Sequence, residues 1–214
     1  LEQRFALKTI FVIDPFYTIP LVIAIVYVWK TNNESLRYKY IIRGLIISSS
    51  YLLLSCFIKL YALSQFEQVL TTQGIQYSEI IVKPTAFNLI LWNANVGTTD
   101  NYLLSDYSLF DTQPISFVAY SKNKVLEKQL IGNPDFEKLK KASEGWYIIS
   151  QKDENLYFND LRFGLLNDNP ANPQFAFSYQ FIQNNSEMHA KEVPKSKREG
   201  RLLLQKIVTR LKGN

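Results

Sequence analysis

Asp14 is the residue with the clearest potential for chemistry, because its carboxylate lies near the start of an almost unbroken apolar run, Ile10 to Trp29. An ionisable side chain inside an apolar segment of membrane length is costly and by default indicates a functional site. Asp14 also precedes Pro15, and this pair is a typical helix start, in which the Asp side chain caps free backbone N–H groups. One residue can do both, so both interpretations stay open.

Two further segments place polar residues in apolar surroundings. Asn88 and Trp92 belong to the sequence KPTAFNLILW, in which a turn signal precedes an apolar strand. Asn88 either satisfies backbone groups, as buried amides usually do, or lines a site that faces the membrane. Asp160 and Arg162 belong to the sequence DLRFG. Two residues apart on a strand, they share one face, and we expect a paired charge there.

Composition excludes several classes of site. His189 is the only histidine and Cys56 the only cysteine of the 214 residues, so we exclude a Ser-His-Asp triad, a histidine- or cysteine-based zinc site and an intrachain disulfide. The glycines are isolated, which excludes a Gly-rich phosphate loop. Residues 75–185 carry nine basic and twelve acidic side chains. We therefore expect no nucleic acid as a partner, because a nucleic-acid-binding domain concentrates positive charge on its fold.

Two apolar segments position Asp14, and we interpret them as a transmembrane hairpin within residues 1–74, with spans at about 10–29 and 40–63. About 20 apolar residues in a helix cross a hydrocarbon core of about 30 Å. The connection 30–43 carries four basic residues and one acidic residue. The positive-inside rule then places this loop in the cytoplasm and the following domain outside it. The lipid bilayer is thus the first expected partner.

Residues 75–185 read as a soluble α+β domain with a mostly antiparallel sheet and one helical insertion. The helical insertion covers 124–131 and 134–142. The predicted strands are 78–82, 88–96, 102–110, 115–120, 145–150, 156–164 and 174–183.

Residues 186–214 read as a polar linker and a basic tail helix. Leu203, Ile207 and Leu211 recur at the spacing of one helix face, with basic residues around them. Such a helix either binds anionic lipid headgroups or keeps the terminus soluble, and we favour lipid contact because basic residues near a membrane surface strengthen attachment.

Three motifs in order, FVIDPFYTIP (11–20), KPTAFNLILW (83–92) and DLRFG (160–164), resemble the C-terminal half of the membrane-bound metal-dependent hydrolases, a family of bacterial inner-membrane proteins. Their order and approximate spacing match along most of residues 5–183. Two positions depart from the family pattern: Ala86 stands where the family has proline, and Asn93 where it often has a basic residue.

The resemblance implies a multi-pass protein of the bacterial inner membrane whose divalent metal, zinc, is held by its own N-terminal membrane region. We therefore expect this chain to be a fragment that binds no metal alone and is inactive alone. Asp14 and Thr18 would lie nearest the metal, with the soluble domain as an accessory or gating cap. The substrate would be a lipid or another membrane-proximal ester.

Two other interpretations stay open. A non-catalytic membrane-anchored binding or sensing module fits the lack of a catalytic constellation in these residues. A transporter accessory subunit is less well supported, because two spans form no transport pathway alone.

Overall fold

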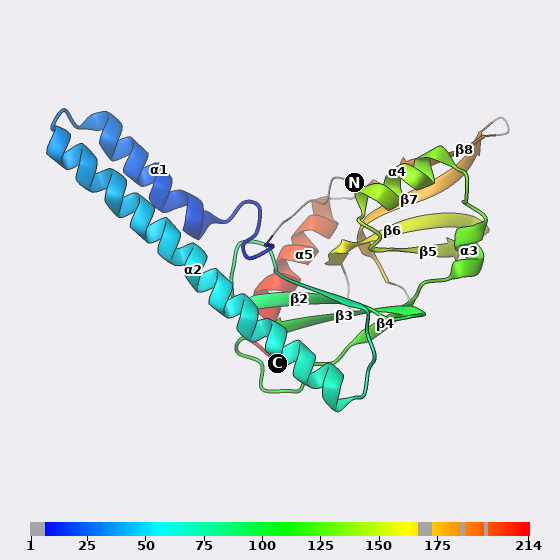
Figure 1. The fold of residues 1–214 in the computed structure, drawn as a ribbon. Coiled ribbons are helices and arrows are strands. Elements are labelled where there is room, and N and C mark those ends of the chain that lie inside the picture. Colours follow the sequence, from blue (N-terminus) through cyan, green and yellow to red (C-terminus); the bar gives the residue numbers. More distant parts are fainter. Residues whose placement is uncertain (1–6, 167–172, 185–186, 195–196) are drawn as a thin grey trace.

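The computed structural model describes residues 7–166, 173–184, 187–194 and 197–214. It is an α+β protein in which a long apolar helix precedes two antiparallel sheets (Figure 1). Among these residues, α2 is the one helix that is long and apolar enough to cross a membrane, judged by length and composition.

The two N-terminal helices begin at clear capping residues. α1, Pro15–Lys30, has Asp14 as its N-cap and a proline in its first turn. α2, Glu34–Thr72, has Asn33 as its N-cap, whose side chain accepts a hydrogen bond from the Leu36 amide at 3.2 Å. The connection expected over residues 30–43 is therefore wrong: most of it is helical, because Asn33 starts the second helix early.

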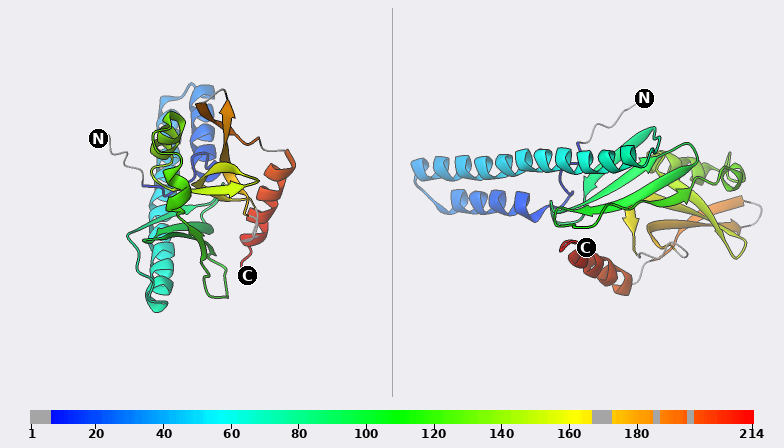
Figure 2. Two further views of the ribbon diagram at one scale, coloured as in Figure 1. Left: turned by 90° about the vertical axis from the view of Figure 1, so that its right-hand side faces the viewer. Right: turned by 90° about the horizontal axis from the view of Figure 1, so that it is seen from below.

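Small residues allow α1 to pack along the first half of α2 (Figure 2). A Cβ atom added to Gly44 would lie 2.5 Å from the Cβ of Ala24. The Ser48 hydroxyl donates to the Tyr17 carbonyl at 3.3 Å. Close backbone approach at Gly and Ser is the usual way in which helices pack without large apolar side chains between them.

The strands form two four-stranded antiparallel meanders, whereas the sequence suggested one sheet. Sheet A contains β1 (Glu79–Pro84), β2 (Leu91–Gly97), β3 (Asn101–Ser108) and β4 (Val118–Ser121). Sheet B contains β5 (Tyr147–Lys152), β6 (Asn155–Leu165), β7 (Phe175–Asn184) and β8 (Glu187–Glu192). The expected helical insertion separates the two sheets, as α3 (Lys124–Lys128) and α4 (Pro134–Ala142).

The elements stack in four layers. The C-terminal half of α2 covers one face of sheet A, with Phe66 packed against Trp92 and Tyr107. The other face of sheet A meets sheet B through a second core that includes Leu104 and Leu161. α4 covers the outer face of sheet B; its core residues are Phe136, Tyr147, Ile149, Phe158 and Phe181.

β8 occupies residues that the sequence analysis assigns to a linker, so the linker prediction is wrong over Glu187–Glu192. The strand forms because its residues alternate: Met188 and Ala190 pack against the core of sheet B, while His189 is exposed. The predicted domain boundary at residues 185 and 186 lies outside the described residues.

The predicted tail helix is present as α5, Lys197–Arg210. Its C-terminal end is fixed at the end of β3: the Arg210 guanidinium forms two 2.8 Å hydrogen bonds with the carboxylate of Asp111, three residues after this strand, and the Ser108 hydroxyl donates to the Leu211 carbonyl at 3.2 Å. Leu203, Ile207 and Leu211, the predicted apolar face, are half-buried. The adjoining side of the helix exposes Leu204 and Val208.

Candidate functional site

Asp14 lies where the chain enters α1, and its side chain is almost completely buried, at 1% exposure. Its Oδ1 accepts hydrogen bonds from the backbone N–H groups of Phe16 (3.0 Å) and Tyr17 (3.4 Å). Its Oδ2 accepts a hydrogen bond from the Tyr51 hydroxyl of α2 at 3.0 Å. The capping interpretation is confirmed, and Tyr51 adds a contact between the two helices that the sequence did not indicate.

Thr18 follows Asp14 by one helical turn. Its backbone N–H donates to the Asp14 carbonyl at 3.0 Å, which is the first hydrogen bond of α1. The Thr18 side chain is exposed, whereas that of Asp14 is buried. The two residues are therefore adjacent through the backbone, but their side chains do not share one environment.

Asn88 and Trp92 have structural roles. The Asn88 amide oxygen accepts from the N–H groups of Ile90 and Leu91, and its amide nitrogen donates to Thr85 Oγ1, so this side chain closes the turn before β2. That turn is why β2 begins at Leu91 and not at Asn88. Trp92 is fully buried, and its indole N–H donates to the Leu89 carbonyl at 2.8 Å.

Asp160 and Arg162 form the expected charge pair on β6. The Arg162 Nη2 lies 2.7 Å from Asp160 Oδ2, and its Nε lies 3.1 Å from Oδ1 and 3.2 Å from Oδ2. The Asp160 carboxylate is 8% exposed and the Arg162 side chain is 24% exposed. A bidentate pair with little solvent around it is held in one geometry.

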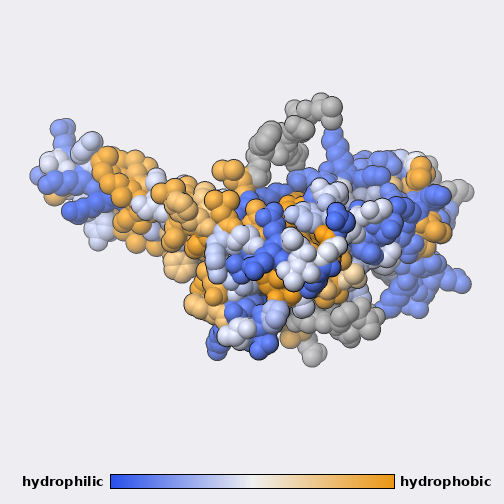
Figure 3. All heavy atoms as spheres, turned by 60° about the horizontal axis from the view of Figure 1, so that its bottom comes forward, coloured by the Kyte–Doolittle hydropathy of each residue, from blue (hydrophilic) through white to orange (hydrophobic). Residues whose placement is uncertain are grey.

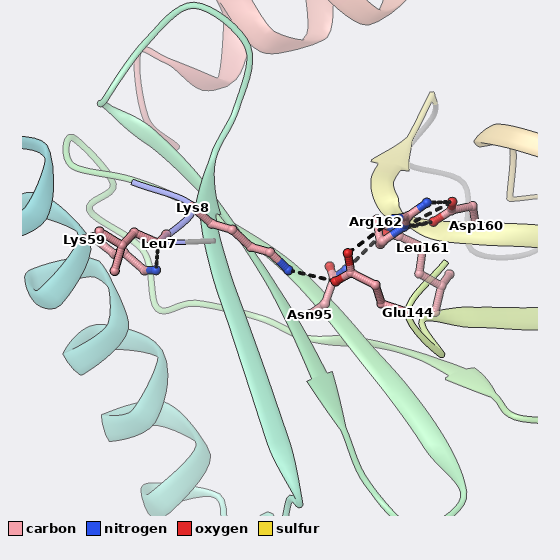
Figure 4. Close-up of polar contacts among 8 residues, drawn as sticks. All are labelled: Leu7, Lys8, Lys59, Asn95, Glu144, Asp160, Leu161 and Arg162. Atoms are coloured by element: carbon pink, nitrogen blue, oxygen red, sulfur yellow. Dashed lines mark hydrogen bonds and ion pairs between the residues drawn. The ribbon is translucent and has the colours of Figure 1, made fainter. Parts of the chain in front are cut away.

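Glu144 connects this pair to the N-terminal segment (Figure 4). Its Oε1 lies 3.8 Å from Arg162 Nη1, and its Oε2 accepts from Lys8 Nζ at 3.4 Å. Next to Lys8, the Leu7 carbonyl accepts a hydrogen bond from Lys59 of α2. Polar contacts thus run from α2, through the segment before α1, to sheet B.

A row of polar side chains crosses sheet A on the face toward sheet B. Lys83, Asn93 and Asp106 are register partners on β1, β2 and β3. The Asn93 amide donates to Asp106 Oδ1 at 2.9 Å, and the Asn95 amide donates to the Leu161 carbonyl of sheet B at 2.9 Å. Within the described part of the chain, the buried Oδ1 atoms of Asn93 and Asn95 have no hydrogen-bond partner.

Lys83 is the cation of this row, and its pKa is strongly shifted. Burial and, to a smaller extent, the positive charges of Lys8 and Arg162 lower the pKa of Lys83 to about 8, although Asp160 and Asp106 oppose the shift. The row formed by Lys83, Asn93 and Asp106 was not predicted from the sequence. The only signal was polar side chains at alternate positions of an apolar strand, and their convergence depends on the pairing of three strands.

Residues 83–92 contact each of the other two segments that carry the family resemblance. Phe11 and Phe87 pack edge to face, with ring centroids 5.5 Å apart. Lys83 Nζ lies 5.9 Å from the centroid of the Phe163 ring. Residues 11–20, 83–92 and 160–164 are far apart in the sequence, so this junction is formed by the fold.

A protein-bound divalent metal needs several carboxylate, imidazole or thiolate ligands at one place. No three His, Cys, Asp or Glu side chains among the described residues lie together as a metal would require. Each oxygen of the Asp14 carboxylate already accepts a hydrogen bond. The described residues do not fit a metal by themselves. No protein-family model, curated protein or solved structure matches the chain.

Proposed function

We propose that this chain is the C-terminal part of a membrane-bound, metal-dependent hydrolase of the bacterial inner membrane, acting on a lipid or another membrane-proximal ester. The observation that carries the proposal is the junction of residues 11–20, 83–92 and 160–164. Residues that share one function are expected to lie near one another, and residues 83–92 contact both other segments although all three are far apart in the sequence. The divalent metal, zinc in this proposal, would be held by groups of the protein's own N-terminal membrane region.

The surface of α1 and α2 supports membrane insertion of both helices. Only 17% of the most apolar stretch of α2 is buried, unlike the core helix of a soluble protein. Arg43 and Lys59 flank the uncharged part of α2 and are about 24 Å apart along the helix, so their side chains can snorkel to the headgroups of a bilayer whose hydrocarbon core is about 30 Å thick. Apolar atoms cover the projecting helices, and hydrophilic atoms gather at their tip (Figure 3). The small residues between the helices are typical of packing within lipid.

The charge at the tip supports an orientation. Lys30 ends α1, and three further basic residues lie in the first ten residues of α2: Arg37, Lys39 and Arg43. Glu34 is the only acidic residue of the stretch 30–43. The positive-inside rule assigns such a tip to the cytoplasm. The two-sheet domain would then lie outside the cytoplasm.

Asp14 is the residue of this chain that we propose to act with the metal site. An Asp14→Asn change keeps a good N-cap, because Asn caps helices about as well as Asp, but it removes the negative charge. In the complete protein, assayed with a phospholipid ester, we expect turnover to fall at least about 100-fold, as on loss of an acid–base group. The circular dichroism spectrum should not change.

The matched control is Asn33→Asp, which makes the opposite exchange at the N-cap of α2 and should leave turnover unchanged. Wild-type turnover by Asp14→Asn would restrict Asp14 to capping and contradict its proposed role.

We propose anionic lipid headgroups as the partner of α5. This helix lies on the side of the domain that is nearer to α1, whereas α3 lies at the far end (Figures 1 and 2). Its outer side exposes Leu204 and Val208 beside Arg201. A photoreactive residue at position 204 should cross-link to phospholipid in nanodiscs that contain anionic lipid, and one at Val125 of α3 should not. Equal cross-linking at both positions, or none at either, would contradict this contact.

A membrane-anchored binding module is the second candidate. The unpartnered amide oxygens of Asn93 and Asn95 favour it, because unsatisfied buried acceptors in native proteins often have a role other than folding. For this module we expect Asp14→Asn to leave partner binding unchanged, so the same variant separates the two candidates.

A further inference from the structure

A small hollow at the end of the domain remote from α1 collects lysine side chains from several elements. Its volume is about 200 Å³, and its lining includes Tyr102, Lys122, Lys124, Glu127, Lys140 and Tyr147. These residues come from the start of β3, the connection from β4 to α3, α3 itself, α4 and β5. We call it the lysine hollow.

The charge of the lysine hollow is opposite to that of its surroundings. Residues 75–185 carry nine basic and twelve acidic side chains, but the hollow is lined by three lysines and one carboxylate. Charges of one sign on the walls of a concave site concentrate the field there and attract the opposite charge. An anion is therefore the expected occupant.

Lys122 forms no ion pair with a carboxylate of the described residues and is held by other groups. Its Nζ donates to the Thr98 carbonyl at 2.6 Å and lies 4.5 Å from the centroid of the Tyr102 ring. Lys124 lies 3.4 Å from Asp100, but both side chains are exposed, so this ion pair is weak and an anion can compete with Asp100 for the lysine. Two of the three positive charges are thus available to an anion.

Lys140 shares the single carboxylate with a tyrosine. Glu127 Oε1 accepts from Lys140 Nζ at 3.1 Å and from the Tyr147 hydroxyl at 2.6 Å. Burial, and then the bond to Glu127, raises the pKa of Tyr147, so its hydroxyl remains a donor. Glu127 orients both groups and also limits the positive charge of the hollow.

We propose that the lysine hollow binds the phosphate group of inorganic phosphate or of a small soluble phosphomonoester. A hollow of about 200 Å³ accommodates a phosphate group and is smaller than the roughly 300–1,000 Å³ of drug-sized ligand pockets. Lysine is an ordinary phosphate ligand. The hollow lies at the opposite end of the domain from α1 (Figure 1), so its ligand comes from solution. This proposal does not rest on the proposed hydrolase function.

The test is calorimetric titration of the detergent-purified chain with inorganic phosphate and, separately, phenyl phosphate. At about pH 7.5 both probes are largely dianions, and sodium chloride keeps the ionic strength constant. We expect saturable binding of one phosphate group per chain. Tighter binding of phenyl phosphate indicates an organic phosphomonoester as the ligand, and equal binding indicates free phosphate; both support the site.

Two variants with opposite expected effects on phosphate affinity make the test specific. Lys140→Gln should weaken binding at least about tenfold, because it removes a charged donor and leaves Glu127 to repel the anion. Glu127→Gln should tighten binding, because it removes the only carboxylate among the residues that line the hollow. Lys141→Gln is the matched control: this exposed neighbour on α4 does not line the hollow, and affinity should not change.

Three results would overturn the proposal: no saturable binding by the wild-type chain, equal weakening by Lys140→Gln and Lys141→Gln, or weaker binding by Glu127→Gln. If circular dichroism shows that Lys140→Gln does not fold, Glu127→Gln and Lys124→Gln decide the outcome. Lys124→Gln should weaken binding without affecting the fold, because this side chain is exposed.

Discussion

At the scale of single residues, Lys83 sets a pH dependence of stability. The pKa of this amine is lowered from 10.5 to about 8, so between these values the unfolded chain binds a proton that the folded chain does not. The free energy of unfolding should therefore rise with pH across this window, by at most about 1.4 kcal/mol per pH unit for one proton. Below about pH 8 the lysine is charged in both states and contributes no slope.

Urea unfolding of the detergent-solubilised chain between about pH 7 and pH 9.5 measures this slope below the range in which tyrosines ionise. The control is Lys83→Met, which keeps the apolar stem and removes the amine. At pH 7 this variant should unfold at a higher urea concentration than the wild type. Its free energy of unfolding should also rise less with pH than that of the wild type. Identical slopes for both proteins would show that Lys83 is not the responsible group.

The interactions of single residues were predictable from the sequence where the interaction partner lies close in the chain. Asp14 caps the helix that begins at Pro15, and Asp160 pairs with Arg162, because each interaction spans two or three residues. Tyr51 lies 37 positions after Asp14, and no local pattern indicates that its hydroxyl meets that carboxylate. The row formed by Lys83 and its register partners was missed for the same reason.

At the scale of elements, the contact between Gly44 and Ala24 determines how closely α1 and α2 pack. Gly44→Ala places two Cβ atoms 2.5 Å apart, which forces the helices to separate. We expect a loss of about 1–3 kcal/mol, as for other overpacked sites. Adding Ala24→Gly should restore most of the stability, since it removes the opposing Cβ atom.

Thermal unfolding in detergent micelles compares the single variants with the double variant. If the double variant is less stable than Gly44→Ala, so that the stability losses of the two single variants add, then the two residues do not face each other.

The elements themselves were predictable where periodicity and caps agree. The two apolar helices, the insertion before β5 and the tail helix follow from such patterns. The start of α2 was placed too late, because a polar, basic stretch resembles a loop although Asn33 caps it. β8 was missed because its alternation covers only six residues, of which Met188 and Ala190 are the apolar pair.

At the scale of the whole molecule, the division into two sheets was beyond the sequence. Seven predicted strands permit many pairings, and the choice depends on side chains far apart in the chain. Leu104 and Leu161 meet in the core between the sheets, and Phe66 of α2 covers the other face of sheet A. The result is a polar two-sheet domain attached to a projecting apolar pair of helices (Figure 3).

The central claim is that this chain works as part of a metal-dependent hydrolase whose metal is held by other groups of the same protein. The most direct test is elemental analysis of two detergent-purified proteins: residues 1–214 alone, and the complete product of the gene. The account predicts a divalent metal, close to one per chain, in the complete protein and none above background in residues 1–214. Absence of metal from both proteins would contradict the hydrolase proposal and leave the membrane-anchored binding module.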